Sequence, residues 1–559
     1  MLTDENIDFE TGSQTKETNE GTTSVIDADD AYLLQMGYKS EFKRDFTFLG
    51  LFSLVQSELA VLPGVAGTIW YTLGYLGLIG MTWGWLVGAV MGQFLVYSLA
   101  ELSSAYPTSG GLYYWAYMTA SPRWKMFSCY ICAWSMVIST PLACCSITYS
   151  AAQLLIATVQ LAHPDYEAQA WHIYLVYLAM MFISYVIICL PTKMVSWFNI
   201  WASAFGTVVL LIATILLPIK AAQNGQINSA KAIFTKAFNQ TGWPAGWAFC
   251  MTFLSPTWTL SGYDVAAHVA EETYNAAVTV PKAMIYSTWS STFLGFFYLI
   301  SLALCAVDIE ELMDNPLGQP IGTLFGNVLG VKAGVALLAI NFVCQLACGI
   351  AFFVAASRIF FAYARDKALP GHAWLSKVSP TTHTPNNASL AVFVISSAFG
   401  AISIGSETAF EAFFSGSTLA GQISYILPVL GRVLYEDNPD YRNGPYHLGR
   451  WSKTIRRIAV AWNAFIMPLV SFPDYPGPSA ADMNWAVVIY VPMQVLAVIY
   501  WWFWGYQTFK GPCPNLEGMN RAKEGVLNAD DSAERISSRD SGDAEKVEIH
   551  RRVVVKPVS

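Results

Sequence analysis

The amino-acid sequence predicts an all-α integral membrane protein with about twelve transmembrane helices. The 559 residues are 54% hydrophobic and only 13% charged, with a mean hydropathy of +0.40, whereas soluble proteins carry about 25% charged residues. Apolar segments of about 20 residues or more recur along the chain. Two of these segments, the first and the sixth, are interrupted by proline and glycine. Composition therefore indicates the membrane, and the interruptions indicate a particular arrangement within it.

Both ends of the chain are polar. Residues 1–45 are rich in Asp, Glu, Thr, Ser and Asn and contain no apolar run behind basic residues of the kind found in signal peptides, and residues 509–559 are similarly polar. Lys39, Lys43 and Arg44 stand directly before the first apolar segment, which by the positive-inside tendency places the N-terminus in the cytosol. We therefore expect two disordered cytosolic tails around a transmembrane domain of residues 46–508.

Twelve spans are predicted between the tails. Their approximate cores are 46–74, 77–103, 125–158, 171–191, 195–218, 243–270, 284–307, 329–363, 386–404, 407–433, 456–473 and 484–507. The predicted inner loops carry the basic residues Arg123, Lys125, Lys193, Lys282, Arg365, Lys367, Lys377, Arg432, Arg442, Arg450, Lys453, Arg456 and Arg457. The predicted outer loops are poorer in basic residues, except for 219–242, and long loops weigh less in this rule. That loop holds the sequon Asn239-Gln240-Thr241, so Asn239 is a glycosylation candidate.

The interrupted helices predict a repeat. The first reads from Leu49 to Trp70 and contains Pro63, Gly64 and Gly67, while the sixth contains Pro256 and Gly262. Non-helical backbone at membrane depth persists only where it is buried in protein or lines a cavity. Each interrupted helix opens a group of about five spans, 46–218 and 243–433, which is typical of a five-plus-five inverted-repeat secondary transporter. Spans 456–507 are then an addition. The alternative is that proline and glycine merely kink two ordinary membrane helices.

Glu58 is the most informative single residue. Counting about 1.5 Å per residue from Phe46 places it roughly 18 Å into a core of about 30 Å. An ionised carboxylate there costs about 2.5–3.5 kcal/mol, so Glu58 should face a cavity or a partner, or bind a proton. The alternative is a protonated Glu58 bonded to a neighbouring helix.

A stripe of titratable residues follows the sixth interruption. Asp264, His268 and Glu272 stand at i, i+4 and i+8, with Glu271 beside them, which places them on one helix face. Together with Glu58, we interpret Asp264, His268 and Glu272 as candidates for proton coupling or gating.

Aromatic residues near the interruptions suggest how a cation could be held. Trp258 and Tyr263 flank the sixth-helix interruption, and Tyr130 and Trp134 lie one turn apart in the third span. An ammonium group over such faces gains about 0.5–2 kcal/mol, although packing alone explains any one aromatic. No metal-spaced His cluster, nucleophile elbow or phosphate-binding glycine loop is found. The ten cysteines read as small buried hydrophobes. We therefore predict no metal, no cofactor and no nucleic-acid partner.

Several longer motifs resemble one family. The segments are AELSSAYPTSGGLYYW (100–115), SPTWTLSGYDVAAHVAEET (255–273), RIFFAYARDKALPG (358–371), GPYHLGRWS (444–452) and MNWAVVIY (483–490). In this order they resemble the fungal amino acid/choline transporter family, which is GABA permease-like and lies within the amino acid–polyamine–organocation superfamily. The resemblance extends over nearly all of the chain from residue 38 to 507.

The resemblance implies an activity and a site. It implies alternating access and uptake of a small amine-bearing solute, such as an amino acid, GABA, choline, a polyamine or a vitamin-type compound, driven by an ion gradient that is usually of protons. By the match, residues 63–68 and 255–262 are the unwound segments. The substrate-binding candidates are Pro63, Gly64, Val65, Ala66, Gly67, Tyr130, Trp134, Ser255, Trp258, Ser261, Gly262 and Tyr263. We expect the protein in the plasma membrane.

The sequence departs from the family pattern at two places, and it lacks the coupling lysine that some bacterial relatives carry within the fifth helix. Glu58 stands where an apolar residue is usual, the glycine-rich turn reads Pro63-Gly64-Val65-Ala66-Gly67, and Lys193 at the edge of the fifth span is the available counterpart of a coupling lysine. These departures make an organic cation a rival to an amino acid as substrate. A membrane-embedded enzyme is disfavoured because no catalytic cluster is present, and a nutrient sensor on the same fold is disfavoured because both tails are short.

Overall fold

The computed structural model of the chain describes residues 42, 44–314, 319–405, 407–479 and 483–512, with side chains omitted at 407–411. Within these residues the regular structure is helical, and nine segments are long and apolar enough to cross a membrane. The predicted tails, 1–45 and 509–559, lie mostly outside the described residues. At the N-terminal side Phe42, Arg44 and Asp45 are described: the Phe42 ring is buried 5.0 Å from that of Phe361, and Asp45 N donates to Glu272 O at 3.0 Å.

Ten of the twelve expected crossings lie in these nine segments, because the first segment crosses twice; the sixth and the eleventh lie outside them. The first segment runs over 58 residues, Phe48–Ala105, and reverses at Leu76 and Gly77, where Gly77 has φ 64. It comprises α2 (Phe48–Leu59), α3 (Val61–Ile79), η1 (Gly80–Gly84) and α4 (Trp85–Ala105). The sixth crossing is divided into pieces that are each too short to span, and the eleventh, α20 (Ser452–Val470), carries three basic residues in its first two turns.

The remaining helices complete the bundle. The other crossings are α6 (Lys125–Ala162), α7 (Ala170–Ile188), α8 (Thr192–Gln223), α10 (Ala245–Met251) with α11 (Leu254–Thr259), α12 (Val265–His268) and η2 (Ala270–Glu272), α13 (Ala276–Cys305), α16 (Val331–Arg365), α18 (Asn386–Gly400) with η3 (Ala401–Ile404), α19 (Glu407–Leu434), and α21 (Ala486–Tyr500) with η5 (Trp501–Gly505) and α22 (Tyr506–Thr508). Short connecting helices are α5 (Leu112–Thr119), α9 (Ala232–Thr235), α14 (Ile309–Met313), α15 (Pro320–Leu329), α17 (His372–Leu375) and η4 (Gly449–Trp451).

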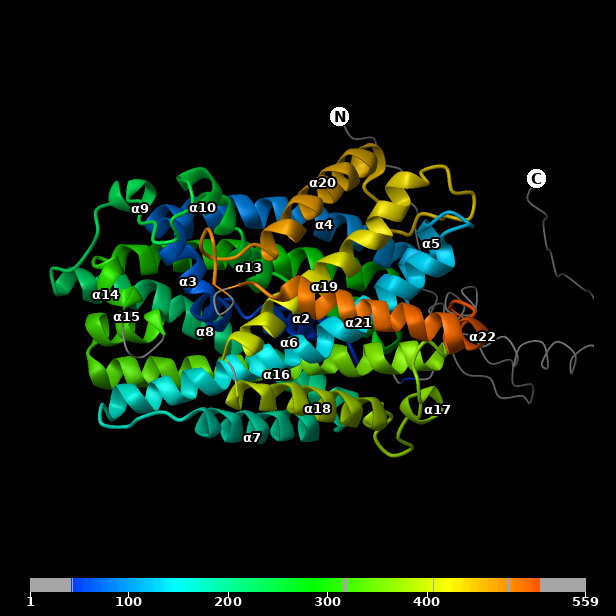
Figure 1. The fold of residues 1–559 in the computed structure, drawn as a ribbon, viewed down its shortest axis with the longest axis horizontal. Coiled ribbons are helices and arrows are strands. Elements are labelled where there is room, and N and C mark those ends of the chain that lie inside the picture. The colour runs from blue at the N-terminus through cyan, green and yellow to red at the C-terminus, as the bar shows by residue number, and fades with distance from the viewer. Residues whose placement is uncertain (1–41, 43, 315–318, 406, 480–482, 513–559) are drawn as a thin grey trace, which may run out of the picture.

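The two ends of the bundle are distinguished by these short helices. In Figure 1 α9, α14 and α15 lie at one end, called the α9 end below, and α5 and α17 lie at the other, called the α5 end. Phe46 pairs with Thr273 through an isolated parallel bridge, so the first crossing begins at the α5 end, where the sixth crossing finishes. The two five-helix groups therefore run in opposite directions, as an inverted repeat requires.

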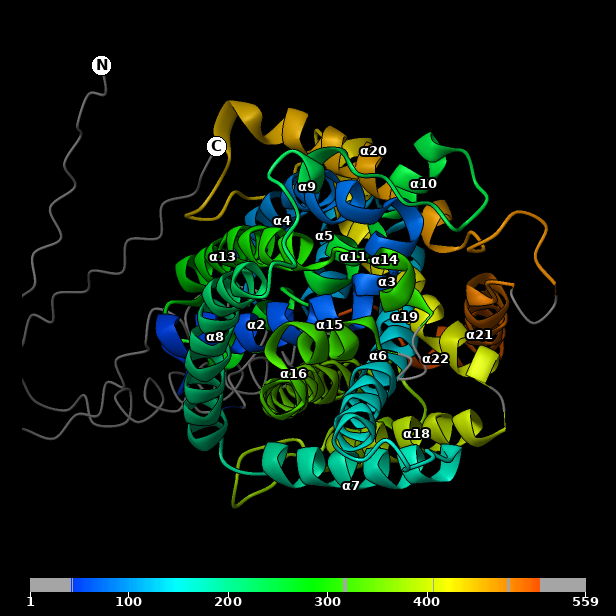
Figure 2. The same cartoon turned by 90° about the vertical axis from the view of Figure 1, so that its left-hand side faces the viewer.

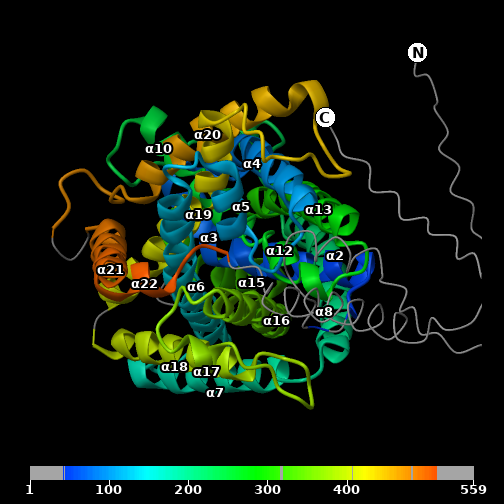
Figure 3. The same cartoon turned by 90° about the vertical axis from the view of Figure 1, so that its right-hand side faces the viewer.

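Packing separates a protein interior from a lipid-facing surface. The long helices α6 and α16 pack along each other through the middle, while α7 and α18 lie side by side along one edge (Figure 2). The added helix α21 lies at the periphery (Figure 3). Helix α8 exposes large apolar side chains, with Ile215 at 63% and Trp201 at 60%. Such faces fit a hydrocarbon solvent, so the exposed surface agrees with an integral membrane protein.

Candidate functional site

The first crossing is interrupted at Ala60. This residue has φ 25 and ψ 67, α2 ends before it and α3 begins after it. Gly64 N donates to Ala60 O at 2.9 Å, so Pro63 stands in the first turn of α3, where its missing N–H breaks no helical bond. The prediction that residues 63–68 are unwound is therefore wrong by about one turn. The proline marks the start of the second half-helix and not the interruption itself.

The sixth crossing is interrupted from Leu260 to Asp264. Gly262 lies in this segment with φ +99, a backbone conformation that disfavours any side chain. The prediction of an unwound 255–262 is correct for its last three residues. It is wrong for Ser255 to Thr259, because these belong to α11. Pro256 again falls near the start of a short helix.

A central cavity of about 70 Å³ lies where the two interruptions meet. It is lined by Glu58, Leu59, Ala60, Gly64, Ser139, Ala143, Ile147, Trp258, Thr259, Ser261, Gly262, Gln345, Cys348, Phe352, Ser417, Thr418, Gly421, Gln422 and Tyr425. Helices α2, α3, α6, α11, α16 and α19 supply most of these residues, and the interruptions themselves supply Ala60, Ser261 and Gly262. Of the predicted residues, Glu58, Gly64, Trp258, Ser261 and Gly262 are thus brought together.

Glu58 is the one charged residue in this lining. It is 5% exposed, and among the described atoms its Oε2 has no hydrogen-bond partner. Its carboxyl group lies against Gly262, where a Cβ would be 2.8 Å from Glu58 Cδ. Its own backbone oxygen accepts from Cys348 Sγ at 3.1 Å. A buried carboxylate without a partner is costly, so this position fits a group that binds a proton or a cation.

A chain of hydrogen bonds leads from the cavity toward the α5 end. Gly262 N donates to Tyr425 Oη at 3.2 Å, and Tyr425 Oη donates to Asp264 Oδ1 at 2.5 Å. Asp264 Oδ2 lies 3.2 Å from His268 Nε2, and His268 Nδ1 lies 3.1 Å from Ser109 O. Because a carbonyl oxygen only accepts, Nδ1 carries a proton. The predicted pair of Asp264 and His268 is therefore joined, through Tyr425, to the backbone beside Glu58.

Two buried ion pairs close the α5 end below that chain. Glu272 accepts from Arg358 Nε at 2.9 Å and from Arg358 Nη2 at 3.3 Å, and Thr192 Oγ1 donates to it at 2.7 Å. Glu271 accepts from Arg365 Nη1 at 3.0 Å and Nη2 at 3.1 Å. Both are two-pronged pairs of the strong kind. Sequence reasoning identified the two acids but paired neither with an arginine, counting Arg365 only among the inner-loop basic residues, and it assigned no role to Tyr425.

A wider vestibule of about 590 Å³ lies on the α9 side of the central cavity. It is lined by Ala66, Gly67, Ile69, Trp70, Tyr71, Gln153, Leu254, Trp258, Gln319, Pro320, Ala412, Phe414, Ser415, Thr418, Val470, Phe472, Asp474, Tyr475, Met483, Asn484 and Trp485. Trp258 and Thr418 line both spaces. The Trp258 ring lies 3.9 Å from that of Phe414, centre to centre. This aromatic pair therefore separates the vestibule from the cavity.

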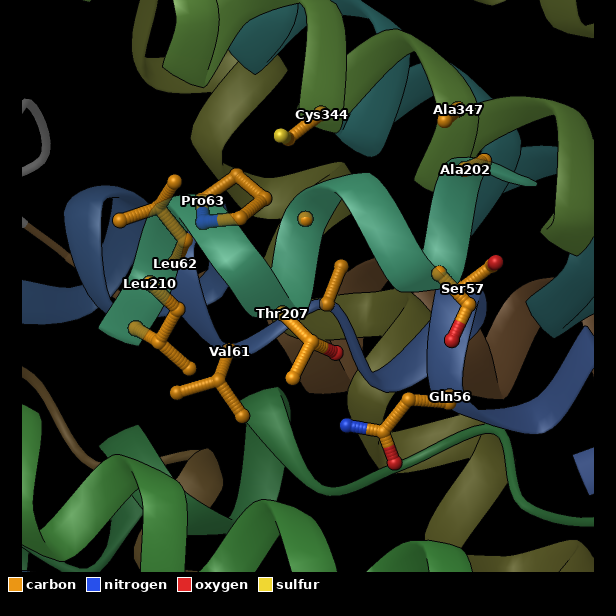
Figure 4. Close-up of a pocket in the computed structure, with 13 residues that line it drawn as sticks. Gln56, Ser57, Val61, Leu62, Pro63, Ala202, Thr207, Leu210, Cys344 and Ala347 are labelled. Atoms are coloured by element: carbon orange, nitrogen blue, oxygen red, sulfur yellow. The ribbon is translucent and has the colours of Figure 1, made fainter. Parts of the chain in front are cut away.

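A smaller chamber of about 30 Å³ borders the first interruption on the side of α8 and α16. Figure 4 shows Gln56 and Ser57 of α2, Pro63 of α3 and Thr207 of α8 around it. No charged side chain is in its lining. Lys193, at the start of α8, is exposed and does not line this chamber.

Tyr130 and Trp134 are not brought to the cavity. Tyr130 Oη donates to Ala497 O at 2.8 Å, and its ring lies 4.5 Å from that of Trp501. The Trp134 ring lies 6.0 Å from that of Tyr500. Their face of α6 is covered by α21, a helix outside the two repeats. The expectation that Tyr130 and Trp134 line the cavity is therefore wrong, because both side chains pack against α21 and η5 instead.

The other candidates support the site or lie near it. Ser255 Oγ lies 2.9 Å from Thr68 Oγ1 and so ties α11 to α3, and Tyr263 stacks on Tyr425 at 5.3 Å. Val65 is buried within α3, whereas Ala66 and Gly67 line the vestibule and Pro63 lines the small chamber.

Asn239 lies exposed in the loop at the α9 end. Its amide nitrogen donates to Trp243 O at 2.8 Å, and its oxygen accepts from Thr241 N at 2.9 Å. Asn239 is therefore exposed, whereas Thr241 of the sequon is buried, and modification of Asn239 stays a prediction. Within the described residues, no group of three or more His, Cys, Asp or Glu side chains could hold a metal ion.

The fold is that of a multi-span membrane protein with a cavity between two broken helices, an arrangement typical of transport proteins. Comparison with known proteins agrees: the profile of the amino acid permease family matches residues 46–499. The chain belongs to this family, within the amino acid–polyamine–organocation superfamily.

Three relatives illustrate the range of the similarity. An uncharacterized amino-acid permease of Schizosaccharomyces pombe is 34% identical over 90% of each chain. Amino-acid permease 2 of Neurospora crassa is 31% identical, and a putative polyamine transporter of Candida albicans is 28% identical, each over 88% of this chain and 90% of its own.

Proposed function

We propose that this permease imports a small amine-bearing solute together with protons. The observation that carries the proposal is Glu58, a buried carboxylate with an unpartnered oxygen in the central cavity. Intramembrane carboxylates that face a cavity are commonly proton or cation sites. Proton binding would neutralise Glu58, and proton release would restore its attraction for a cation.

Alternating access fits the two closures around the cavity. Toward the α5 end, the Glu272–Arg358 and Glu271–Arg365 pairs block passage, whereas toward the α9 end the barrier is one aromatic pair. Import requires the aromatic pair to open first and the ion pairs to part afterwards. The Tyr425, Asp264 and His268 chain offers protons a path toward the α5 end when those pairs part.

The cavity favours a positively charged substrate group. The C-terminal end of α2 is at the cavity through Leu59 and Ala60, and helix C-termini carry partial negative charge. The first turn of α3 offers few backbone donors to a substrate carboxylate, because Pro63 has no N–H and Gly64 N is bonded to Ala60 O. The exposed face of Trp258 adds a surface for an ammonium group.

A dedicated organic-cation permease is the second candidate. It would carry choline, thiamine or a polyamine, and Glu58 favours it because a substrate without a carboxylate leaves that charge to be balanced by the protein. A zwitterionic amino acid or GABA brings its own carboxylate. The relatives include proteins named amino-acid permease and putative polyamine transporter, so their names fit both candidates.

The proposed orientation places the α5 end in the cytosol of a plasma-membrane protein, with both termini inside. Of the basic residues in the predicted inner loops, Arg123 and Lys377 lie in connections between helices at the α5 end, and Lys282 lies near the start of α13. This distribution follows the positive-inside tendency.

Uptake in transporter-deficient cells tests the function. Cells expressing the permease would receive labelled choline, spermidine, GABA and neutral amino acids in turn, with unlabelled competitors that include uncharged and anionic analogues. We expect amines to compete and a protonophore to abolish accumulation. Equal competition by uncharged or anionic analogues would contradict the cationic substrate. Binding without any uptake would instead favour a nutrient sensor.

A further inference from the structure

The vestibule has the chemistry of a binding site as well as the position of an entrance. Its volume of about 590 Å³ falls within the range of about 300–1,000 Å³ that is usual for small-molecule pockets. Seven of its lining residues are aromatic. Asp474 is the one charged residue among the described lining residues. A negative charge among aromatic faces is the arrangement that recognises organic cations.

Asp474 is held in a defined position. Tyr75, on α3, donates its hydroxyl to Asp474 Oδ1. The surrounding loop is anchored as well: Trp243 Nε1 donates to Pro473 O at 3.2 Å, and Asn484 Nδ2 donates to Phe472 O at 3.1 Å. Hydrogen bonds therefore position both the Asp474 carboxylate and the backbone around it.

Burial makes this carboxylate ready for a counter-charge. It raises the pKa of Asp474, while the hydrogen bond from Tyr75 acts in the opposite direction. Asp474 is half-buried, and a partly desolvated carboxylate regains favourable energy when a cation approaches it. No lysine or arginine is among the described lining residues to supply that charge.

We propose that the vestibule is a second binding site, selective for ammonium-bearing organic cations, in which Asp474 provides the counter-charge and the aromatic walls provide the contact faces. It is separate from the central cavity, because Glu58 does not line it and the Trp258–Phe414 pair stands between them. The inference rests on the proposed function in one respect: the bound cation is the solute that passes on to the central cavity.

Protection of an introduced cysteine tests the site directly. Ser415 lines the vestibule on α19 and is half-buried, so Ser415→Cys places a thiol in its wall. Full-length purified protein would be labelled with a trimethylammonium-ethyl methanethiosulfonate and with the anionic sulfonatoethyl reagent. Protein without this substitution gives the background from native cysteines, and a free thiol in solution gives the intrinsic ratio of the two rates.

The expected result has two parts. Relative to the free thiol, the cationic reagent should be preferred about tenfold, and Asp474→Asn should remove this preference. Choline or spermidine should slow labelling, whereas 3,3-dimethyl-1-butanol, an uncharged analogue of choline, should not. Asp474→Asn should raise the protecting concentration about tenfold or more. Asp308→Asn is the matched control, since it removes an exposed carboxylate at the same end outside the vestibule and retains an N-capping side chain.

The outcomes separate this inference from the proposed function. Labelling of purified protein requires no transport, and protection should persist in Glu58→Gln, which alters only the central cavity. Protection that disappears in Glu58→Gln would assign it to the central cavity and overturn the vestibule site. Failure of both choline and spermidine to protect, or protection unaltered by Asp474→Asn, would overturn it too and leave the vestibule as a water-filled entrance. A protein that is protected but does not transport would contradict the proposed function alone.

Discussion

The carboxyl group of Glu58 occupies the space where residue 262 would place a side chain. A Cβ on Gly262 would lie 2.8 Å from Glu58 Cδ and would overlap its Oε1. Gly262 also has φ +99, which other residues rarely adopt. The interruption in the sixth crossing and the acid beside the first one are therefore fitted to each other.

Replacing this glycine should disable the site. Gly262→Ala should lower uptake at least about tenfold, because the added methyl group strains the backbone and displaces Glu58. Gly246→Ala is the matched control: Gly246 is in α10 of the same crossing and has open space around its Cβ position, so uptake should stay close to that of the unaltered protein. Uptake assays normalised to surface expression give the comparison. Equal uptake by both variants would show that the contact with Glu58 carries no functional weight.

The sequence predicts the crossings better than the interruptions. Hydropathy and the paired Pro and Gly positions were enough for twelve spans and an inverted repeat, because these features act locally. The position of the first interruption was missed, since Pro63 is tolerated within the first turn of α3 and the strained residue is Ala60, an ordinary alanine. Nothing in the local sequence distinguishes Ala60 from other alanines.

The residues of the site were only partly predictable from the sequence. Glu58, Asp264 and His268 stood out because charge is rare within apolar segments. Arg358 was not assigned to Glu272, although both are charged, because they are 86 positions apart and pairing over such a distance depends on tertiary packing. Tyr130 and Trp134 were misplaced because α21 covers their face of α6, and the repeat pattern carries no information on helices outside it.

Neutralising Glu58 should separate binding from coupling. Glu58→Gln keeps the shape of the side chain but removes the titratable group, so accumulation should no longer respond to pH or to a protonophore. Exchange of labelled for unlabelled solute should be retained, though with weaker affinity for cations. Glu310→Gln, an exposed acid on α14, controls for the loss of one negative charge. Unchanged pH dependence in Glu58→Gln would exclude this residue as the coupling site.

Breaking the Glu272–Arg358 ion pair at the α5 end should destabilise the folded protein. Arg358 is 1% exposed, so Glu272→Gln leaves a buried charge uncompensated, which costs about 3–5 kcal/mol. The melting temperature in detergent should fall clearly, and adding Arg358→Met should recover part of it. Glu436→Gln is the comparison, because its partners Lys453 and Arg457 are 60% and 64% exposed and such pairs contribute little. A melting temperature unaltered by Glu272→Gln would mean that the pair does not hold this end closed.

Acidification should weaken cation selectivity in the vestibule. Burial raises the pKa of Asp474 above its ordinary value of 3.8, so the side chain is charged above that raised pKa and neutral below it. The preference of the Ser415→Cys thiol for the cationic reagent should therefore decline as pH falls through a midpoint above 3.8. Both reagents react with the same thiolate, so the ratio of their rates does not depend on the titration of the Ser415→Cys thiol.

The partner of Asp474 provides the check on this assignment. The hydrogen bond from Tyr75 lowers the pKa of Asp474, so Tyr75→Phe should move the midpoint to higher pH. The neighbouring phenols of Tyr71 and Tyr475 carry no charge at acidic pH. Asp474→Asn should give a ratio that is independent of pH. A midpoint that stays in place in Tyr75→Phe would assign the titration to another group.

Trp258 should act as the barrier between vestibule and cavity. It lines both spaces and stacks on Phe414, so Trp258→Ala should join them, whereas Trp258→Phe should preserve much of the separation. A cysteine at Ser139, which lines the cavity but not the vestibule, reports on access. Its labelling by the cationic reagent should accelerate about tenfold or more in Trp258→Ala, since the reagent no longer waits for a rare opening.

Trp134→Ala is the control for this prediction. It removes the same kind of side chain on the α21 side of α6 and should leave the labelling rate unaltered. Equal labelling rates in Trp258→Ala and Trp134→Ala would place the barrier elsewhere, and the aromatic pair would then be a packing contact of α11 with α19.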